Sequence, residues 1–374
     1  MGDESLKKVK EFIKSQSVLV IAFLAALVTV FIIPPDRSYG GYINRTVLIQ
    51  LFCLMTAVCG FRSIGVFENA SAVLLRKAGS VRRLGIIFTL VCFFTSMLVT
   101  NDVALITFVP LTLMVYEKIE DEKSRIFTIV LETAAANLGS MVTPFGNPQN
   151  LYIYDKYKLT LGDFFVTLLP SAAVSLAALL LLCLILPKRN CTAVTAEPQK
   201  ISKVKGTVYL GVFVLCLLTV FRVVPDWLCL IAAVTVALIC DRKLLLKVDY
   251  GLLATFVCFF VFVGNIARIE SVSRFVSEII EGRELLVSAV ISQAISNVPA
   301  AVMLSGFTDN GRELLLGVNL GGLGTIIASL ASLISFRFYR ASEGARSGKY
   351  MAVFSAVNFG LLTLLLTLAV VGIL

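Results

Sequence analysis

Two polar motifs interrupt the apolar stretches of this chain, and each motif occurs twice. SMLVTND at residues 96–102 is matched by SQAISNV at 292–298, and NLGSMVT at 137–143 is matched by NLGGLGT at 319–325. The spacing is constant within each pair, 196 residues for the first motif and 182 for the second. Polar groups are expensive within membrane hydrocarbon, so the matched pairs favour a duplicated fold with a functional site between its halves.

The apolar stretches are long enough to cross a membrane. Hydrophobic residues make up 58% of the chain, above the roughly 45–50% that is usual in soluble proteins. Runs of about 20 apolar residues span a bilayer core of about 30 Å. The sequence therefore predicts an all-α polytopic membrane protein, with continuous spans at 17–34, 43–61, 163–187, 206–224, 226–241, 250–269 and 350–373.

Four other apolar segments are interrupted. Residues 83–117 and 284–307 turn back at a polar tip and are expected to form re-entrant hairpins, whereas 124–158 and 312–340 contain Gly, Pro or Asn and are expected to form broken helices. Irregular backbone at membrane depth must line protein or a wet cavity. These four segments are therefore expected to surround the site.

Amphipathic stretches at 64–80 and 270–281 come before the two hairpins and are expected to lie in the membrane interface, unless they are ordinary loop helices.

Charge indicates the orientation. With a cytoplasmic N-terminus, 24 of the 33 Lys and Arg residues fall in cytoplasmic segments and 9 fall outside. This positive-inside bias accounts for the net charge of +9 without a nucleic-acid partner. The resulting topology puts the C-terminus outside, and a compact chain of this kind suits a prokaryotic inner membrane.

The same topology makes the two halves inverted repeats. The first repeat is expected at 15–187 and the second at 206–374, joined by a polar cytoplasmic linker at 188–205. The span at 206–224 is the extra crossing that links the halves. Inverted repeats of this kind are typical of secondary transporters, and they suit alternating access better than an open channel.

The residue inventory argues against an enzyme and against a bound cofactor. Histidine is absent, and the nine cysteines show no C-x-x-C spacing. Neither H-E-x-x-H nor G-x-S-x-G occurs. Proton chemistry would have to use carboxylates, so the only expected accessory is a coupling ion, sodium or a proton.

Each hairpin tip is expected to leave free carbonyl and N–H groups where one helix ends and the next begins. Helix N-termini favour anions, whereas carbonyls and carboxylates favour cations. Asn101 or Asp102 is expected to cap the second arm of the first hairpin, and Asn297 that of the second. Simple capping without a ligand is the alternative. The candidate binding residues at the tips are Thr100, Asn101, Asp102, Ser296 and Asn297.

The broken helices supply further candidates. In TPFGNPQN, at residues 143–150, the prolines remove backbone donors and the glycine permits a tight reversal. The matching segment GGLGTIIAS, at 321–329, is expected to unwind through its glycines. A kink without function is the alternative. The candidate binding residues of the two segments are Thr143, Pro144, Gly146, Asn147, Asn150, Gly324, Thr325 and Ser329.

Two carboxylates are expected within the membrane. Asp102 is expected to bind a coupling cation or to carry a proton, and Asn101, Asp102 and Asn297 are the candidate sodium ligands. Glu132 is either a proton-relay group or a hydrogen-bonded structural residue. No Lys or Arg falls at a tip, so an anion there would depend on helix termini, neutral polar groups and a bound ion.

Four motifs in order, TNDVALITFVPL, TPFGNPQNL, SNVPAAV and GVNLGGLGT, resemble the ion transporter superfamily of permeases. More narrowly, they resemble the citrate-transporter-like and arsenite-permease group, with the divalent-anion/sodium symporters as relatives. This resemblance implies a homodimeric elevator transporter. A scaffold part, at 15–80 and 206–281, would hold the dimer, and a transport part, at 82–187 and 282–374, would slide carrying the site.

The tips depart from the dicarboxylate carriers of this group, in which both tips read Ser-Asn-Thr. Here the third places are Asp102 and Val298. The Asn-Asp pair is more similar to the arsenite permeases, which export a neutral oxyacid in exchange for protons. The sequence therefore favours a proton- or sodium-coupled secondary transporter of a small anion such as a carboxylate or oxyanion. The alternatives are a proton-coupled efflux permease for arsenite- or antimonite-type oxyacids and a sodium/proton antiporter.

Overall fold

The computed structural model describes residues 16–67, 69, 79–191 and 201–374. Every regular element in these ranges is a helix, and one isolated antiparallel bridge joins Ser80 to Asn190. The all-α prediction is confirmed. Most of the predicted amphipathic stretch at 64–80 and half of the predicted linker at 188–205 lie outside the described residues.

Nine apolar helices of the described chain account for the predicted spans and for the first arm of each expected hairpin. Six are long and apolar enough to cross a membrane: α4 (Arg45–Ser63), α6 (Val81–Leu98), α10 (Leu161–Cys183), α11 (Lys203–Val220), α14 (Tyr250–Ala267) and α20 (Ser347–Val370). Three are shorter: α2 (Ser17–Ile32), α12 (Asp226–Cys240) and α16 (Glu284–Ile295). The prediction of a polytopic membrane protein is thereby confirmed.

The two expected hairpins are pairs of helices interrupted at matched residues. The first pair, α6 and α7 (Asn101–Glu117), is interrupted at Val99 and Thr100, and the second, α16 and α17 (Asn297–Leu304), at Ser296. Thr100 has a φ of 134° and Ser296 a φ of 76°. Positive φ costs a non-glycine residue about 1–3 kcal/mol. The surrounding packing therefore holds both tips in the same strained form.

The two expected broken helices are interrupted at the glycine and proline residues, as predicted. The first consists of α8 (Glu122–Ser140) and α9 (Pro148–Lys156), and the second of α18 (Gly311–Leu320) and α19 (Leu330–Ala341). Asn147 caps α9, since its side chain accepts a hydrogen bond from the N–H of Asn150 at 2.9 Å. Ser329 caps α19 through the N–H of Ala331 at 3.2 Å.

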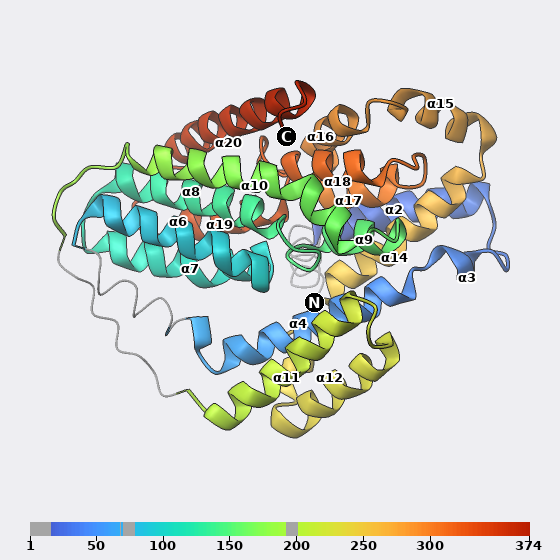
Figure 1. The fold of residues 1–374 in the computed structure, drawn as a ribbon, viewed down its shortest axis with the longest axis horizontal. Helices are drawn as coiled ribbons and strands as arrows, with labels where there is room; N and C mark the ends of the chain where they lie inside the picture. Colours follow the sequence, from blue (N-terminus) through green and yellow to red (C-terminus); the bar gives the residue numbers. More distant parts are fainter. Residues whose placement is uncertain (1–15, 68, 70–78, 192–200) are drawn as a thin grey trace, which may run out of the picture.

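The helices pack in two groups, which Figure 1 shows as α4, α11 and α12 at the bottom and α6, α7 and α8 at the left. The first group contains α4, α11 and α12, which pack on one another, and the pair α2 and α14, which joins them through the contact of α14 with α4. The short helices α3 (Tyr39–Tyr42), α13 (Lys243–Leu246) and α15 (Glu270–Ile280) accompany these, and α14 packs more extensively on α17 of the second group than on α4. The hairpins, the broken helices, α10 and α20 make up the second. The main contacts between the groups are those of α14 with α17 and of α4 with α9.

Glycine lets a hairpin arm approach a broken helix closely, and this contact occurs twice. A Cβ atom at Gly139 of α8 would overlap the carbonyl oxygen of Phe93 and lie 2.6 Å from Oγ of Ser96 in α6. A Cβ atom at Gly321 would lie 2.9 Å from Cβ of Ser292 in α16. These serines and glycines are the matched residues of the repeated motifs, so close packing explains part of the repetition.

Candidate functional site

Both hairpin tips and both broken helices meet at one small void. It measures about 10 Å³ and is lined by Asn101, Asp102, Pro148, Gln149, Leu252, Asn297, Val298, Ser329 and Leu330. A volume of roughly 10–15 Å³ accommodates one water molecule. The fold thus brings four predicted site residues, Asn101, Asp102, Asn297 and Ser329, to one point.

Asn137 of α8 joins the first tip to the second broken helix. Its Oδ1 accepts hydrogen bonds from Nδ2 of Asn101 at 3.1 Å and from Oγ of Ser329 at 2.8 Å. Its Nδ2 donates to the carbonyl of Gly322 at 3.4 Å. The candidate residues from sequence did not include Asn137. Its recurrence as Asn319 was the signal that could have identified it.

Asn319 of α18 binds the first broken helix in the corresponding way. Its Oδ1 accepts from Nδ2 of Asn147 at 3.1 Å, and its Nδ2 donates to Oδ1 of Asn150 at 2.6 Å. Nδ2 of Asn150 faces three carbonyls of the unwound segment at 3.1–3.4 Å. In this conformation both predicted ligands, Asn147 and Asn150, are buried and have protein partners for their side-chain oxygens.

The two threonines tie each unwound segment to the end of a hairpin arm. Oγ1 of Thr143 donates to the carbonyl of Met97 at 2.6 Å, and Oγ1 of Thr325 donates to that of Gln293 at 2.8 Å. All four residues are matched by the repeat spacings. In this conformation the threonine hydroxyls satisfy carbonyls that the interrupted helices leave free.

The remaining candidates shape the backbone of the unwound segments. Pro144 is buried between α8 and α9. A Cβ atom at Gly146 would overlap the carbonyl of Ser140, and one at Gly324, whose φ is 97°, would overlap Oε1 of Gln293. Glycine is therefore required sterically at both positions.

The expected helix caps at the tips are wrong. Helix α7 begins at Asn101 and α17 begins at Asn297, with Thr100 and Ser296 at the N-cap positions and no side-chain cap at either. The cause is that both helices start directly after the strained tip residue. Asn101 still accepts from the N–H of Asp102 at 3.0 Å, and the N–H of Asn297 donates to the carbonyl of Ala328 at 2.9 Å.

Asp102 is set apart from the other candidates by its environment. Its Oδ1 is buried without a hydrogen-bond partner. Its side chain lines the central void and two larger cavities, one of about 210 Å³ and one of about 150 Å³. An ionised carboxylate oxygen left unpaired in a buried place is costly. A proton or a cation at this oxygen would remove that cost.

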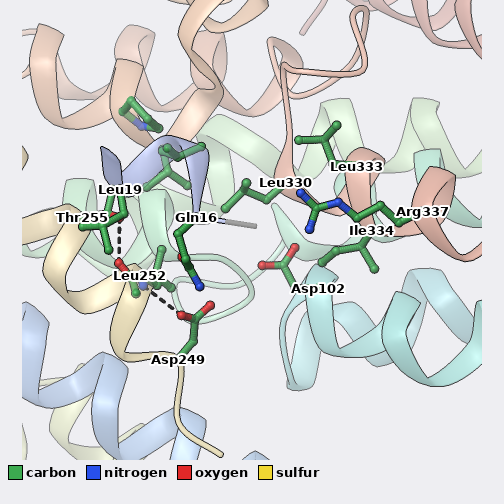
Figure 2. A pocket seen from close by; sticks show the side chains of 14 residues that line it. Gln16, Leu19, Asp102, Asp249, Leu252, Thr255, Leu330, Leu333, Ile334 and Arg337 are labelled. Atoms are coloured by element: carbon green, nitrogen blue, oxygen red, sulfur yellow. Dashed lines mark hydrogen bonds between the residues drawn. The ribbon is translucent and has the colours of Figure 1, made fainter. Parts of the chain in front are cut away.

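The two larger cavities are also lined by charged residues that no sequence pattern connected with the site. Figure 2 shows the side chains of Asp102, Asp249 and Arg337 pointing into the 210 Å³ cavity. Arg62 and Lys247 line the 150 Å³ cavity. The tips carry no basic residue, as predicted, but the fold brings these three cations into the cavities that reach Asp102. They lie far from the tips in sequence, so local patterns gave no signal for them.

Glu132 lies apart from the residues that line the void and the two cavities. It is fully buried in α8, and its Oε1 accepts from Oγ1 of Thr112 at 2.5 Å. Its Oε2 has no hydrogen-bond partner. A role for Glu132 in proton relay stays a prediction.

Comparison with known proteins identifies the family. Residues 12–310 match the model of a family described as citrate transporter, CitMHS. An uncharacterized transporter of Methanocaldococcus jannaschii is 31% identical over 82% of this chain and 84% of that protein. The inner membrane protein YbiR of Escherichia coli is 31% identical over 82% of this chain and 83% of that protein. The resemblance to citrate-transporter-like permeases is thus confirmed.

Two further likenesses are more limited. The silicon efflux transporter LSI3 of Oryza sativa is 32% identical over 43% of this chain and 33% of that protein. The crystal structure of the YdaH transporter of Alcanivorax borkumensis has a similar fold, with a TM-score of 0.55 over 90% of this chain and 88% of that chain. Its sequence identity of 14% speaks for the fold alone.

Proposed function

Because this chain belongs to the citrate transporter (CitMHS) family of membrane transporters, we propose that it is an ion-coupled secondary transporter of a small carboxylate or oxyanion. The coupling ion is a proton or sodium. The substrate is held where the two hairpin tips meet the two broken helices. The part of the proposal that concerns coupling depends on Asp102.

The unpartnered oxygen of Asp102 is the observation that supports ion coupling. This oxygen is buried, and the carboxylate lies between the central void and both larger cavities. A fixed negative charge beside an anionic substrate would be strongly unfavourable in a site of low dielectric constant. Binding a proton or sodium at Asp102 removes this repulsion, so substrate and ion bind together.

An oxygen-rich substrate fits the donors at the centre. The void is lined by the amides of Asn101 and Asn297 and by the hydroxyl of Ser329, and the N-termini of α7 and α17 begin there. Helix N-termini attract anions. The basic residues of the larger cavities, Arg62, Lys247 and Arg337, would raise the local concentration of an anion on its way to the void.

A second candidate is proton-coupled efflux of a neutral oxyacid. Two observations favour it: the carboxylate at the tip, which needs no cation beside an uncharged substrate, and the 32% identity over 165 residues to a silicon efflux transporter. A sodium/proton antiporter is a third candidate, since Asp102 alone could exchange the two ions.

The elevator arrangement, the inverted repeats and the orientation belong to the same proposal. The division of the helices into two packing groups agrees with a scaffold part and a transport part. The basic residues that line the two larger cavities all come from segments assigned to the cytoplasm by charge. The cavities would then open inward. The homodimer and a prokaryotic inner membrane are proposed from the family and its relatives.

Uptake into proteoliposomes tests the function. Labelled citrate and succinate are supplied with an imposed sodium or proton gradient, and Asp102→Asn is measured beside the unaltered protein. Accumulation that requires one gradient, and that loses this requirement in the variant, is the expected result. Accumulation of arsenite or silicic acid alone would favour the second candidate. Transport with unchanged ion dependence in the variant would contradict coupling through Asp102.

A further inference from the structure

Outside the hairpins and broken helices, the two halves also correspond helix by helix. The four-residue helix α3 precedes α4, and the four-residue helix α13 precedes α14. Helix α4 packs against α12, and α14 packs against α2. With the linking span α11 set aside, α2 and α12 are the first spans of the two halves. Each is capped by a residue whose side chain accepts from the N–H three positions on, Asn44 from Val47 at 3.1 Å and Asp249 from Leu252 at 2.9 Å. Thus Asn44 and Asp249 are counterparts.

The contacts between the two packing groups do not follow this correspondence. Helix α4 packs on α9, and α14 packs on α17. Their counterparts would be α14 on α19 and α4 on α7. At those two places the structure has cavities: α14 and α19 line the 210 Å³ cavity, and α4 and α7 line the 150 Å³ cavity. The two groups are therefore closed on one pair of contacts and open on the other.

On the closed side, hydrogen bonds hold α9 and the residues that follow it against the first packing group. Nδ2 of Asn44 donates to Oδ2 of Asp155 in α9 at 2.8 Å. The guanidinium of Arg222 donates to the carbonyls of Tyr154 and Leu159 at 2.8 and 3.2 Å and lies 4.6 Å from the centre of the Tyr154 ring. The bond between Asn44 and Asp155 joins the cap of α4 directly to the second half of a broken helix.

Where α14 and α19 are separated by a cavity, charged residues stand at the positions that correspond to Asn44 and Asp155. The spacing of 182 that relates the broken helices maps the cap Asn147 onto the cap Ser329, and it maps Asp155 onto Arg337. The counterpart of the pair Asn44 and Asp155 is therefore the pair Asp249 and Arg337. These two side chains have opposite charges, and Figure 2 shows them on facing sides of the 210 Å³ cavity.

We propose that Asp249 and Arg337 form an ion pair in the opposite state of the transport cycle, closing the cavity between α14 and α19 when the bond between Asn44 and Asp155 opens. This inference depends on the proposed transport function, since it assigns its two gating residues. Asp249 and Arg337 are positioning residues: they set which side of the protein the site faces. The two residues lie in different packing groups. Movement of one group relative to the other therefore makes the pair in one state and breaks it in the other.

Paired cysteines test the two states directly. In a full-length background in which the nine native cysteines are replaced, one variant carries Asn44→Cys with Asp155→Cys and another carries Asp249→Cys with Arg337→Cys. A short bifunctional thiol reagent is applied in proteoliposomes under opposed ion gradients. The first pair is expected to cross-link in the state described here. The second is expected to cross-link when the gradient is reversed, and either cross-link should stop transport.

Two results would overturn the proposal. One is a second pair that never cross-links under any gradient in a transporting protein whose first pair does. The other is a protein with all four cysteines in which both cross-links form in the same molecule. Cross-linking needs no known substrate. A failure to transport citrate would therefore overturn the proposed substrate, while the cross-linking result for Asp249 and Arg337 would still stand.

Charge removal gives an independent test. Asp249→Asn keeps a good helix cap while removing the charge, and Arg337→Gln removes its partner. Asp249→Asn is expected to lower the ratio of the opposite state to this state by about two- to fivefold, the range of a solvent-exposed ion pair. The double variant should be no worse than either single one. Arg340→Gln, an exposed arginine one turn further along α19, is the matched control and should change nothing.

Cys59 supplies the readout for these variants. It lines the 150 Å³ cavity between α4 and α7, which the opposite state would close. With Cys59 as the only cysteine left, the rate of labelling by a water-soluble maleimide reports the share of the state described here. Equal labelling in Asp249→Asn and Arg340→Gln, under the gradient that drives the opposite state, would show that the ion pair does not form.

Discussion

Replacing Asn150 by alanine distinguishes a residue that holds the fold from one that binds the substrate. Its side chain accepts a 2.6 Å hydrogen bond from Asn319 and donates toward the carbonyls of Ser140, Met141 and Thr143, the nearest at 3.1 Å. Asn150 itself is fully buried in α9, the second half of the first broken helix. The variant therefore removes these bonds, while Nδ2 of Asn319 keeps its bond to the carbonyl of Leu315 and the carbonyl of Thr143 keeps the N–H of Gly146.

The size of the effect follows from these bonds. A hydrogen bond contributes about 0.5–1.5 kcal/mol net to stability. Two well-formed bonds are lost, those to Asn319 and to the carbonyl of Thr143. The free energy of unfolding is therefore expected to fall by about 2 kcal/mol, roughly thirtyfold in the unfolding equilibrium.

Asn358 of α20 provides the matched control. It is also fully buried, but its Nδ2 donates only to the carbonyl of Phe354, four residues back in the same helix, at 3.0 Å, and its Oδ1 has no partner. Asn358→Ala removes the same atoms and should cost about 1 kcal/mol or less. The two variants therefore differ by about 1 kcal/mol if Asn150 acts through the fold.

Denaturant unfolding in detergent micelles, followed by circular dichroism, measures both variants, and uptake into proteoliposomes measures their activity. The expected result is a large loss of stability in Asn150→Ala together with weak transport. If Asn150→Ala unfolds within about 0.5 kcal/mol of Asn358→Ala but no longer transports, the bonds to the unwound segment are not the reason for this residue. Its role would then be that of a ligand.

Three further predictions concern the tips and their packing. Asn101→Ala and Asn297→Ala are each expected to abolish uptake without affecting membrane insertion, which is measured by protease accessibility. Normal uptake by both variants would exclude a site at the tips. Asp102→Asn is expected to lose the dependence of uptake on pH or sodium more than substrate affinity, and an unchanged dependence would contradict coupling there. Gly139→Ala is expected to lower the free energy of unfolding by about 1–3 kcal/mol through overlap with the backbone of α6. Gly360→Ala in α20, where a Cβ meets open space, is its control and should stabilise by up to about 1 kcal/mol.

The spans and their interruptions were predictable because they depend on local chemistry. Apolar length fixes which segments cross a membrane, and proline and glycine at 144–148 and at 321–324 mark where a helix cannot continue. The start of α7 and α17 was misjudged by assigning the caps to Asn101, Asp102 and Asn297. Backbone strain at the tip residue decided the start, and strain of this kind leaves no pattern in sequence.

The partners of the site were not predictable, because they are set by packing between distant segments. Asn137 and Asn319 stood in a repeated motif, yet only the crossing of the broken helices shows that each binds the other half. Arg337 was assigned to a cytoplasmic segment from charge. The same residue lies about two turns along α19 from its cap Ser329, and this brings it to the cavity that contains Asp102.

The small volume at the centre means that a tip has to move when a substrate binds, and the packing of the two tips indicates which one. The void of about 10 Å³ holds one water molecule, so a carboxylate such as succinate requires the tips to separate. The second tip is tightly held, with Ser296 1% exposed and the N–H of Asn297 bonded to the carbonyl of Ala328 at 2.9 Å. The first tip faces both larger cavities through Thr100 and Asp102, whereas the second tip lines only one of them, the 210 Å³ cavity, through Val298 and Pro299. Opening is therefore expected at the first tip, so the substrate would first meet the residue on which ion coupling is proposed to depend.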